Sequence, residues 1–544
     1  MITSTGAVAG DAGAPGPEGM RSTMREAHQV ADVRAAEREL MAALPAGTLM
    51  QRAAAGLASV CAGLLGRVYG SRVVVLAGSG DNGGDALYAA ARLTRRGAAT
   101  LAVAAGSRIH EDGAAALRAA GGRVVGPGDP GVASAVEDAD LILDGMLGIG
   151  GRGGLRDLYA SLARQAAGSL ATVVAVDLPS GIDADTGVVA GTAVRADVTV
   201  TFGTFKPGLL VDPGASHAGV VELVDIGLGP YLGPPGLACP QAGDIAAMLP
   251  SPTGESDKYR RGVLGLVSGS ERFTGAGVLS AGGAIRGGAG MIRYVSAQPA
   301  ADVVRQWWPE TVITVLPPAG PDGRFADGPE GAAEFLRRAG RVQAWVAGPG
   351  MGTGEDAAQV LAAVLRTDVP VLVDADGLTV LGEHRDLLPR QAPTLITPHA
   401  GELARLLGAD RDDVEARRLE HARAAARELG VTVLLKGSTT VICPPADGPG
   451  GPDLVNPTGT PWLATAGTGD VLSGLAGALL AQGLDPAGAA MAAAFLHGVA
   501  ARHAAAGAGE AGDYEQAGDW PAGAPIGAAD VVRALPAAFR AVRG

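Results

Sequence analysis

The sequence predicts an α/β protein made of two domains, each with a three-layer αβα architecture. The first observation is that short apolar segments alternate with helical segments twice along the chain. The second is a Pro/Gly-rich stretch at residues 229–236 that separates the two series. The third is the length of 544 residues, which is too long for one ordinary hydrophobic core. Alternating strands and helices predict parallel sheets with right-handed crossovers.

The domain boundaries follow from changes in composition along the chain. Residues 1–28 are rich in Gly, Ala, Pro and Ser without periodicity, which predicts a disordered tail. We expect the first domain over residues 29–230 and a linker over residues 231–242. The second domain is then expected over residues 243–544.

The first series begins with helical segments and continues as alternating strands and helices. Helical periodicity begins near Asp32 and returns over Leu49–Val68. Short apolar runs follow at regular intervals, as in a Rossmann-like domain. The predicted strands are Arg72–Leu76, Thr100–Ala104, Leu141–Leu143, Thr172–Val176 and Val198–Phe202.

The second series repeats this pattern and ends in helices. A helix is expected after Gly469, and the Gly/Ala-rich segment Ala508–Pro525 is expected to be a loop before a final helix. The predicted strands are Val263–Val267, Met291–Val295, Val342–Val346, Val371–Val373, Thr394–Ile396 and Val431–Leu435.

Charge and cysteine content narrow the choice of partners and location. The net charge is −13 and basic residues are scattered, which argues against nucleic acid and anionic membranes as partners. The three cysteines, Cys61, Cys239 and Cys443, have no metal-ligand spacing. We see neither a secretory signal nor an apolar run as long as a membrane span, so a cytoplasmic location is expected.

The most informative motif is Gly467-Thr468-Gly469-Asp470, which runs into a small-residue segment with helical spacing. Glycines let the backbone approach a ligand closely and direct consecutive N–H groups toward it. A helix that starts there adds partial positive charge, which suits a phosphate group. A carboxylate at such a site is unfavourable unless it handles protons or metal, so we expect Asp470 to be a general base. The structural alternative is a helix start capped by an aspartate.

A second glycine-rich segment, Gly78–Asp85, follows the first predicted strand. It contains the pattern G-x-G-x-x-G that binds dinucleotides at the start of a helix. A nicotinamide-binding dehydrogenase should also place an acid at the end of the second strand, but Ala104–Ser107 has none. The pattern therefore argues against hydride transfer.

Asp144 and Asp177 each close a predicted strand, and the carboxyl ends of neighbouring parallel strands converge on one crevice. Asn82, Asp144 and Ser180 could supply hard oxygen ligands to a cation, which leaves Asp177 for the substrate. The structural alternative is that each aspartate caps the helix that follows it.

Polar groups also end several strands of the second series. Each has a structural alternative, such as a turn glycine or a surface lysine, but together they predict a ligand crevice that faces the Gly469 helix start. These segments are Gly269–Ala276, Gly348–Gly352, Asp374–Leu378, Thr397–Glu402 and Lys436–Thr440.

The first half resembles the NAD(P)HX epimerases of the YjeF N-terminal family, from about residue 30 to residue 228. The resemblance rests on LMQRAAAGLA (Leu49–Ala58), GSGDNGGDAL, DGMLGIG and VAVDLPSGIDADTG. The family usually has Asn where this chain has Asp81. The resemblance implies that Asn82, Asp144 and Ser180 hold a potassium ion. It also implies that hydrated NAD(P)H is bound by Asp81, Asn82, Gly83, Gly84, Asp85, Gly148, Ile149, Gly150, Gly151, Arg152, Gly153, Gly154 and Asp177.

The second half resembles the ADP/ATP-dependent NAD(P)HX dehydratases of the ribokinase-like superfamily, over about residues 245–542. The resemblance rests on AGPGMG, DADGL, ITPHAGE, LLKGSTT and NPTGTPWLATAGTGDVLSG. It implies Mg²⁺ and an adenine nucleotide; bacterial members favour ADP, and the sequence leaves ADP against ATP open. The residues implied to contact the hydrated cofactor are Ala276, Gly350, His399 and Asp470. Those implied to hold the nucleotide are Lys436, Gly437, Ser438, Thr439, Thr440 and Gly469.

The two resemblances together imply one repair enzyme for NADHX and NADPHX, the hydrated and redox-inactive forms of NADH and NADPH. The first domain would interconvert the (R) and (S) epimers, with Asp177 as the choice for proton transfer. The second would dehydrate the (S) epimer with ADP, with Asp470 removing the C6 hydroxyl proton. We expect a homo-oligomer.

The alternative is a ribokinase-like kinase for a vitamin-precursor alcohol, with the first domain as a non-catalytic scaffold. The fused first domain and the Lys436–Thr440 segment argue against this alternative.

Overall fold

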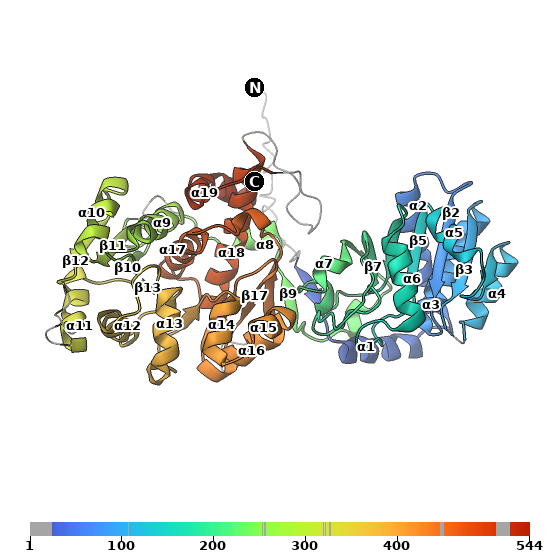
Figure 1. Ribbon diagram of the computed structural model, residues 1–544, viewed down its shortest axis with the longest axis horizontal. Coiled ribbons are helices and arrows are strands. Elements are labelled where there is room, and N and C mark those ends of the chain that lie inside the picture. Colours follow the sequence, from blue (N-terminus) through green and yellow to red (C-terminus); the bar gives the residue numbers. More distant parts are fainter. Residues whose placement is uncertain are drawn as a thin grey trace, which may run out of the picture.

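The computed structural model describes residues 24–106, 108–252, 254, 257–318, 320, 323–325, 328–446, 451–507 and 523–544. The chain forms two β-sheets, and each sheet is covered by helices on both faces (Figure 1). The predicted α/β class with two αβα units is confirmed.

The first sheet has seven strands in the order β4-β3-β2-β5-β6-β7-β8, all parallel. All five strands predicted in this half are present. The two additional strands, β4 and β8, lie at the sheet edges. The bounds are β2 (Arg72–Ala77), β3 (Ala99–Ala104), β4 (Arg123–Val125), β5 (Leu141–Gly145), β6 (Thr172–Val176), β7 (Val198–Phe202) and β8 (Val220–Val224).

The second sheet has eleven strands in the order β1-β9-β18-β17-β16-β15-β14-β13-β10-β11-β12. Strands β10 to β16 pair in parallel, whereas β17 pairs antiparallel with both of its neighbours. The bounds are β1 (Arg25–Ala27), β9 (Leu237–Cys239), β10 (Val263–Val267), β11 (Met291–Ser296), β12 (Val312–Val315), β13 (Ala344–Ala347), β14 (Val371–Val373), β15 (Thr394–Ile396), β16 (Thr432–Leu435), β17 (Thr440–Cys443) and β18 (Asp453–Asn456).

Strands β1 and β9 correct the expected tail and linker. Arg25–Ala27 lies within the predicted disordered tail, yet it pairs antiparallel with Leu237–Cys239, which lies within the predicted linker. Both strands therefore belong to the second sheet, although one precedes the first domain in sequence. Three residues are too few to show a period-2 pattern, so neither strand is visible in the sequence. Residues 1–23 and most of the loop expected at Ala508–Pro525 lie outside the described residues.

Helices cover both faces of each sheet. In the first domain α1 to α4 pack on one face and α5 and α6 on the other. In the second, α11 to α16 share one core and α8 to α10 with α17 to α19 share the other. The first-domain bounds are α1 (Val30–Ala42), α2 (Thr48–Leu65), α3 (Asp81–Arg95), α4 (Glu111–Ala119), α5 (Val132–Glu137), α6 (Asp157–Ala167), η1 (Pro207–Leu209), α7 (Ala215–Ala218) and η2 (Gly229–Tyr231). The second-domain bounds are α8 (Ala242–Met248), α9 (Thr274–Arg286), α10 (Gln298–Trp307), α11 (Gly328–Ala339), α12 (Glu355–Leu365), α13 (Asp376–Glu383), η3 (Arg385–Leu387), α14 (Ala400–Leu407), α15 (Arg411–Ala416), α16 (Arg418–Leu429), η4 (Pro461–Leu463), α17 (Thr468–Ala481), α18 (Pro486–Ala506) and α19 (Ala528–Arg543).

Strand order fixes where a ligand crevice forms in each sheet. The chain builds outward from β2 through β3 to β4, and then restarts on the other side of β2 with β5. The second sheet does the same at β10 and β13. In open parallel sheets, ligands bind beyond the carboxyl ends of the strands at such a switch point. The predicted glycine-rich loops follow β2, β5, β10 and β13 and therefore meet at these two places.

Small residues let helices α9 and α17 pack with unusually close backbones. A Cβ atom on Gly474 would lie 1.9 Å from the carbonyl oxygen of Ser280, and one on Gly283 would lie 2.2 Å from that of Val471. Both helices begin at the carboxyl edge of the sheet, so this packing sets their first turns beside each other. The abundance of glycine thus has a structural cause in this domain.

Helix α2 is the one described helix that is long and apolar enough to span a membrane by length and composition. From the sequence we expected no apolar segment of this length. The face that carries Ala54, Leu57 and Cys61 is buried in the first-domain core against the sheet. Its apolar character therefore has an explanation in core packing.

We predict that Gly474→Ala destabilises the second domain by about 1–3 kcal/mol, because the added methyl group overlaps the α9 backbone. Gly63→Ala is the matched control, since Gly63 is an exposed residue of α2 with no atom within 4 Å of an added Cβ. The control should raise stability by about 0.5–1 kcal/mol through helix propensity. Calorimetric unfolding measures both, and an unchanged melting temperature for Gly474→Ala would contradict the close packing.

Candidate active sites

The predicted cation site lies at the switch point of the first sheet. The side chain of Asp144 is fully buried at the end of β5 and accepts hydrogen bonds from Ser180 N at 2.8 Å and Ser180 Oγ at 2.7 Å. Asn82 is in the first turn of α3. A Cβ on Gly148 would lie 3.1 Å from the Asn82 side chain, so glycine makes room for it. The structure therefore brings the three predicted cation ligands together.

The chemistry of this donor set fits a monovalent cation with oxygen ligands. Burial raises the pKa of Asp144 to about 6, and hydrogen bonds from Ser180 and Met146 oppose the shift only in part. A buried carboxylate of this kind needs a positive partner. Asn82, Asp144 and Ser180 are the residues that would hold potassium.

Asp177 lies at the end of β6 and is paired with a lysine that sequence reasoning missed. Its backbone has φ 64°, a region that non-glycine residues rarely adopt and that often marks functional sites. Lys206 Nζ lies 2.6 Å from Asp177 Oδ1 and also donates to Thr201 Oγ1 at 3.0 Å. The Lys206 side chain is 1% exposed. A lysine inside the apolar run Phe205–Val211 was the available signal for burial.

Further carboxylates of this site carry raised pKa values. The pKa of Asp85 is raised well above its usual value, first by burial and then by the charges of Asp177, Asp81 and Glu37. The pKa of Glu37 is also raised, mainly by burial and by Asp177. Asp177 differs from these two carboxyl groups in that it is paired directly with the ammonium of Lys206. Carboxyl groups in such different environments are candidates for proton transfer.

Helix α1 contributes two residues, Arg34 and Glu37, that the sequence analysis did not include. Arg34 Nη2 lies 3.1 Å from the position of a Cβ on Gly150, so its guanidinium reaches the predicted glycine loop 148–154. That loop and the first turn of α3, with Asp81, Gly83 and Gly84, face the same crevice as Asp177. An arginine and a helix N-terminus together suit a phosphate group of the substrate.

Asp470 lies in the first turn of α17, as predicted. Gly467 precedes the helix with φ 88°, a conformation that favours glycine. Thr468 Oγ1 donates to Leu463 O at 2.8 Å and to Thr465 O at 3.0 Å, which fixes the loop before the helix. The backbone N–H groups around Gly469 lack helical acceptors and are available to an anion.

Lys436 lies next to Gly469, at the centre of the second crevice. Its Nζ atom donates to Asp374 Oδ1 at 2.8 Å and lies 3.7 Å from Glu402 Oε2. It also lies 3.5 Å from the position of a Cβ on Gly469. Ser473 Oγ donates to Asp374 Oδ2 at 2.6 Å and holds the buried carboxylate in place. The residue expected to hold the nucleotide thus has its ammonium group at the predicted catalytic centre.

Burial and the neighbouring charges shift the pKa of Asp470. Its pKa is raised to about 7, first by burial and then by Asp374, while Lys436 acts in the opposite direction. Burial lowers the pKa of Lys436, but Asp374 and Glu402 outweigh burial and raise it. A carboxyl group with a pKa near neutrality is matched to proton transfer at physiological pH.

The remaining predicted contacts with the cofactor surround the same crevice. Gly350 has φ 63°, and a Cβ there would lie 2.7 Å from the Cβ of Ala276, so the loops after β10 and β13 touch. His399 ends β15 and caps α14, because its Nδ1 accepts hydrogen bonds from Gly401 N at 3.0 Å and Glu402 N at 3.2 Å. The ring is 55% exposed and remains accessible to a ligand.

The turn between β16 and β17 carries the other predicted nucleotide residues. Gly437 and Ser438 are exposed, whereas Thr439 and Thr440 are buried. The hydroxyl groups of Ser438 and Thr439 are hydrogen-bonded to Asp212 of the first domain. A nucleotide at this turn would therefore meet its exposed backbone.

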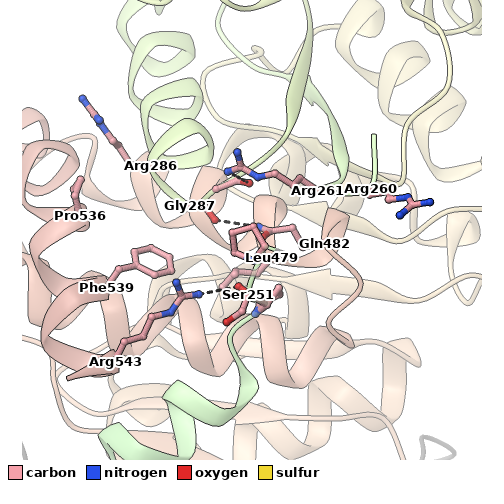
Figure 2. Close-up of a pocket in the computed structure, with 13 residues that line it drawn as sticks. Ser251, Arg260, Arg261, Arg286, Gly287, Leu479, Gln482, Pro536, Phe539 and Arg543 are labelled. Carbon is pink, nitrogen blue, oxygen red and sulfur yellow. Dashed lines mark hydrogen bonds between the residues drawn. The ribbon is translucent and has the colours of Figure 1, made fainter. Parts of the chain in front are cut away.

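A separate cavity of about 330 Å³ lies at the other end of α17 (Figure 2). Gln482 donates to the Gly287 carbonyl there at 3.0 Å, and Arg543 donates to the Pro250 carbonyl at 2.8 Å. None of the predicted site residues lines this cavity. The lining residues are Pro250, Ser251, Pro252, Arg260, Arg261, Arg286, Gly287, Gly288, Leu479, Gln482, Pro536, Phe539 and Arg543.

The fold and the two groups of side chains define a class of protein: a two-domain α/β protein with a cluster of ionisable residues at the switch point of each sheet. Residues 46–208 match the family described as YjeF-related protein N-terminus. Residues 264–517 match the family described as NAD(P)H-hydrate dehydratase. The chain belongs to the family of bifunctional NAD(P)H-hydrate repair enzymes, as its relatives show.

Two curated relatives carry the name bifunctional NAD(P)H-hydrate repair enzyme Nnr. The relative from Mycobacterium leprae (strain TN) is 47% identical over 489 residues, which cover 89% of this chain and 95% of that protein. The relative from Mycobacterium tuberculosis (strain ATCC 25618 / H37Rv) is 47% identical over 475 residues, which cover 86% of this chain and 92% of that protein. Because the match spans both halves, it supports the repair enzyme rather than the kinase alternative.

A solved structure resembles the second half. It is the ADP/ATP-dependent NAD(P)H-hydrate dehydratase from Bacillus subtilis, co-crystallized with ATP/Mg²⁺. The sequence identity is 27% and the TM-score is 0.44. The match covers 56% of this chain and 97% of that chain.

The raised pKa of Asp470 predicts the pH dependence of the second site. The carboxylate form is the base, so kcat/KM for the hydrated cofactor should fall as pH drops below about 7, by about tenfold per unit. Initial rates of NADH recovery between pH 5 and 9, with saturating nucleotide, measure this profile. A rate that stays level down to pH 5 would mean that Asp470 titrates like an ordinary exposed carboxyl group.

Proposed function

We propose that this protein repairs hydrated NADH and NADPH in two steps carried out by its two domains. The first domain interconverts the (R) and (S) epimers of NAD(P)HX. The second converts the (S) epimer back to NAD(P)H in a reaction that consumes a nucleotide. The single observation that carries the dehydratase assignment is Asp470, held in the first turn of α17 with a pKa of about 7 beside Lys436 and Asp374.

In the first domain, we assign the two proton transfers at C6 to Asp85 and Asp177. Asp85, whose pKa is raised by burial, donates a proton to the C6 hydroxyl group as the C–O bond opens, assisted by the lone pair of the ring nitrogen. Asp177 then takes a proton from the water that adds to the opposite face of C6. Lys206 keeps Asp177 in place, and Arg34 with the α3 N-terminus is suited to the phosphates. Asp177 then loses its proton to solvent and Asp85 takes one up, which returns both groups to their starting states for the next turnover.

Potassium belongs to this site by the chemistry of Asn82, Asp144 and Ser180. The cation would supply positive charge to a buried carboxylate and orient the loops that carry these residues. The residues of the chain then keep the C6 region and the phosphates in fixed positions. This role explains why Asp144 is buried without a basic residue among its described contacts.

In the second domain, Asp470 removes the proton from the C6 hydroxyl group as its oxygen attacks the terminal phosphorus of the nucleotide. The N–H groups around Gly469 and the ammonium of Lys436 stabilise the charge on the transferring group. Phosphate then leaves C6 and takes up the proton released from C5, which restores the ring double bond. Mg²⁺ bound with the nucleotide would neutralise the charge of its phosphates.

The turn 436–440 offers an exposed backbone to the adenine nucleotide, and we propose ADP as the donor. Ala276, Gly350 and His399 then contact the hydrated cofactor on the other side of Asp470. We also propose a cytoplasmic location and a homo-oligomeric assembly, as expected from the sequence.

Two reciprocal variants test the assignment of one reaction to each domain. Asp470→Asn should lower dehydration of (S)-NADHX by at least about 1,000-fold, because removal of a catalytic base and charge costs several kcal/mol. Its epimerisation rate should remain within about twofold of wild type. Asp177→Asn should do the opposite. Chromatographic separation of the epimers measures both reactions, and loss of both activities in either variant would contradict two independent sites.

Removal of potassium tests the cation site. Replacement of K⁺ by choline should slow epimerisation by about tenfold or more, and added K⁺ should restore it. Asp144→Asn should remain slow in both buffers, since the charge that binds the cation is gone. Dehydration of purified (S)-NADHX serves as the control and should not change. Epimerisation that runs equally well in choline would exclude a potassium requirement.

A further inference from the structure

The first domain contacts the second at the turn that is proposed to hold the adenine nucleotide. The carboxylate of Asp212 accepts a hydrogen bond from Ser438 Oγ through its Oδ2 atom. The backbone N–H of Asp212 donates to Thr439 Oγ1 at 2.9 Å. Asp212 is 7% exposed, so these bonds are shielded from water. Figure 1 shows α7 of the first domain near β9 and β17 at this boundary.

The same carboxylate is held from its own domain. Asp212 Oδ1 accepts hydrogen bonds from Ser216 N at 2.9 Å and from Ser216 Oγ at 2.6 Å. One oxygen of the carboxylate therefore binds within the first domain and the other binds the second. A side chain fixed in this way has little freedom to lose when it orders its partner.

A buried arginine lies behind the turn. Arg418 is 6% exposed, and its Nη2 donates to the carbonyl oxygen of Lys436 at 2.7 Å. A Cβ on Gly437 would lie 1.9 Å from this nitrogen, so the turn and the guanidinium are in close contact. Burial lowers the pKa of Arg418, and the charge of Asp212 acts against that shift. Asp212 thus also compensates the charge that supports the turn.

Apolar packing also joins the first domain to the turn of the second domain. Leu210 and Val211, which precede Asp212, share one hydrophobic core with Leu435 and Val441, which flank the turn. Val211 is completely buried. The contact is therefore a packed interface, and the hydrogen bonds of Asp212 lie at its edge.

These contacts leave one part of the turn open. Lys436 is tied to Asp374 at one end and Thr439 to Asp212 at the other, while Gly437 and Ser438 between them are exposed. A backbone segment fixed at both ends presents its N–H groups to a ligand without a large entropic cost. The fixing group at one end comes from the other domain.

We propose that Asp212 of the first domain is a positioning residue for the adenine nucleotide of the second. It acts through Ser438 and Thr439, so the first domain completes the nucleotide site of the second. This inference rests on the proposed function, because it takes the turn 436–440 as part of the nucleotide site.

The test compares Asp212→Ala with Ser216→Ala in the full-length protein. Asp212→Ala should raise the Kd and the KM for ADP by about tenfold, because the Ser438 hydroxyl group loses its acceptor and Arg418 loses a compensating charge, while the backbone bond to Thr439 is kept. At saturating nucleotide, kcat and the epimerisation rate should stay within about twofold of wild type. Ser216→Ala removes only a bond inside the first domain and should leave the Kd for ADP unchanged.

A second variant and a direct binding measurement keep the outcome clear. Ser438→Ala removes the hydroxyl group that Asp212 accepts from, and in the Asp212→Ala background it should add less than about threefold to the Kd. Should Asp212→Ala not fold, Asp212→Asn takes its place and should raise the Kd by a smaller factor. An unchanged Kd in the folded Asp212 variants, or a parallel loss of kcat and epimerisation, overturns the inference.

Calorimetry of ADP binding to the wild-type protein separates this inference from the proposed function. Wild type that binds ADP but does not restore NADH from (S)-NADHX would refute the proposed function. The Kd values of the Asp212 variants would still test the positioning role. Wild type that restores NADH, with Asp212 variants of unchanged Kd, would refute the positioning role alone.

Discussion

The structure depends on two lysines, each of which compensates a carboxylate at the end of a parallel strand. Lys206 pairs with Asp177 at 2.6 Å, and Lys436 pairs with Asp374 at 2.8 Å. Carboxyl groups brought close together repel each other and lose hydration, and a nearby cation offsets both effects. In each domain one carboxylate is paired with a lysine, while burial raises the pKa of a neighbour, Asp85 in the first domain and Asp470 in the second. The fold thereby obtains groups that can give and accept protons near neutral pH.

Close backbone packing supplies the other half of each site. At the second switch point, helices α9 and α17 approach through glycines, and the first turn of α17 carries both Asp470 and the N–H groups near Gly469. The base and the anion site are therefore parts of one rigid element. At the first switch point the same relation holds between the first turn of α3 and the loop 148–154.

Much of this arrangement can be predicted from the sequence, because strand ends are local features. The strand and glycine patterns placed Asp144 and Asp177 at the ends of strands and the 467–470 motif at the start of a helix, as the structure has them. Lys206 was missed because its partner lies 29 residues away, and pairing across that separation is decided by tertiary packing. Strands β1 and β9 were missed because three residues carry no usable periodicity. Glu37 was missed because nothing on helix α1 indicates which way it faces.

The two sites are joined by two short segments that meet at the domain boundary. Lys206 and Asp212 lie on the same segment of the first domain, and Lys436 and Ser438 lie on the same turn of the second. The product of one site is the substrate of the other, so a fixed interface keeps both sites in one molecule. It also gives the first domain a structural reason to remain attached to the second.

The most direct measurement follows the absorbance of reduced nicotinamide in an equilibrated mixture of both NADHX epimers with the protein, Mg²⁺, K⁺ and excess ADP. If both lysine-supported sites are active, the whole mixture should return to NADH. Recovery that stops at the (S) fraction and continues only at the slow spontaneous rate would contradict an active first site. No recovery at all would contradict the account of both domains.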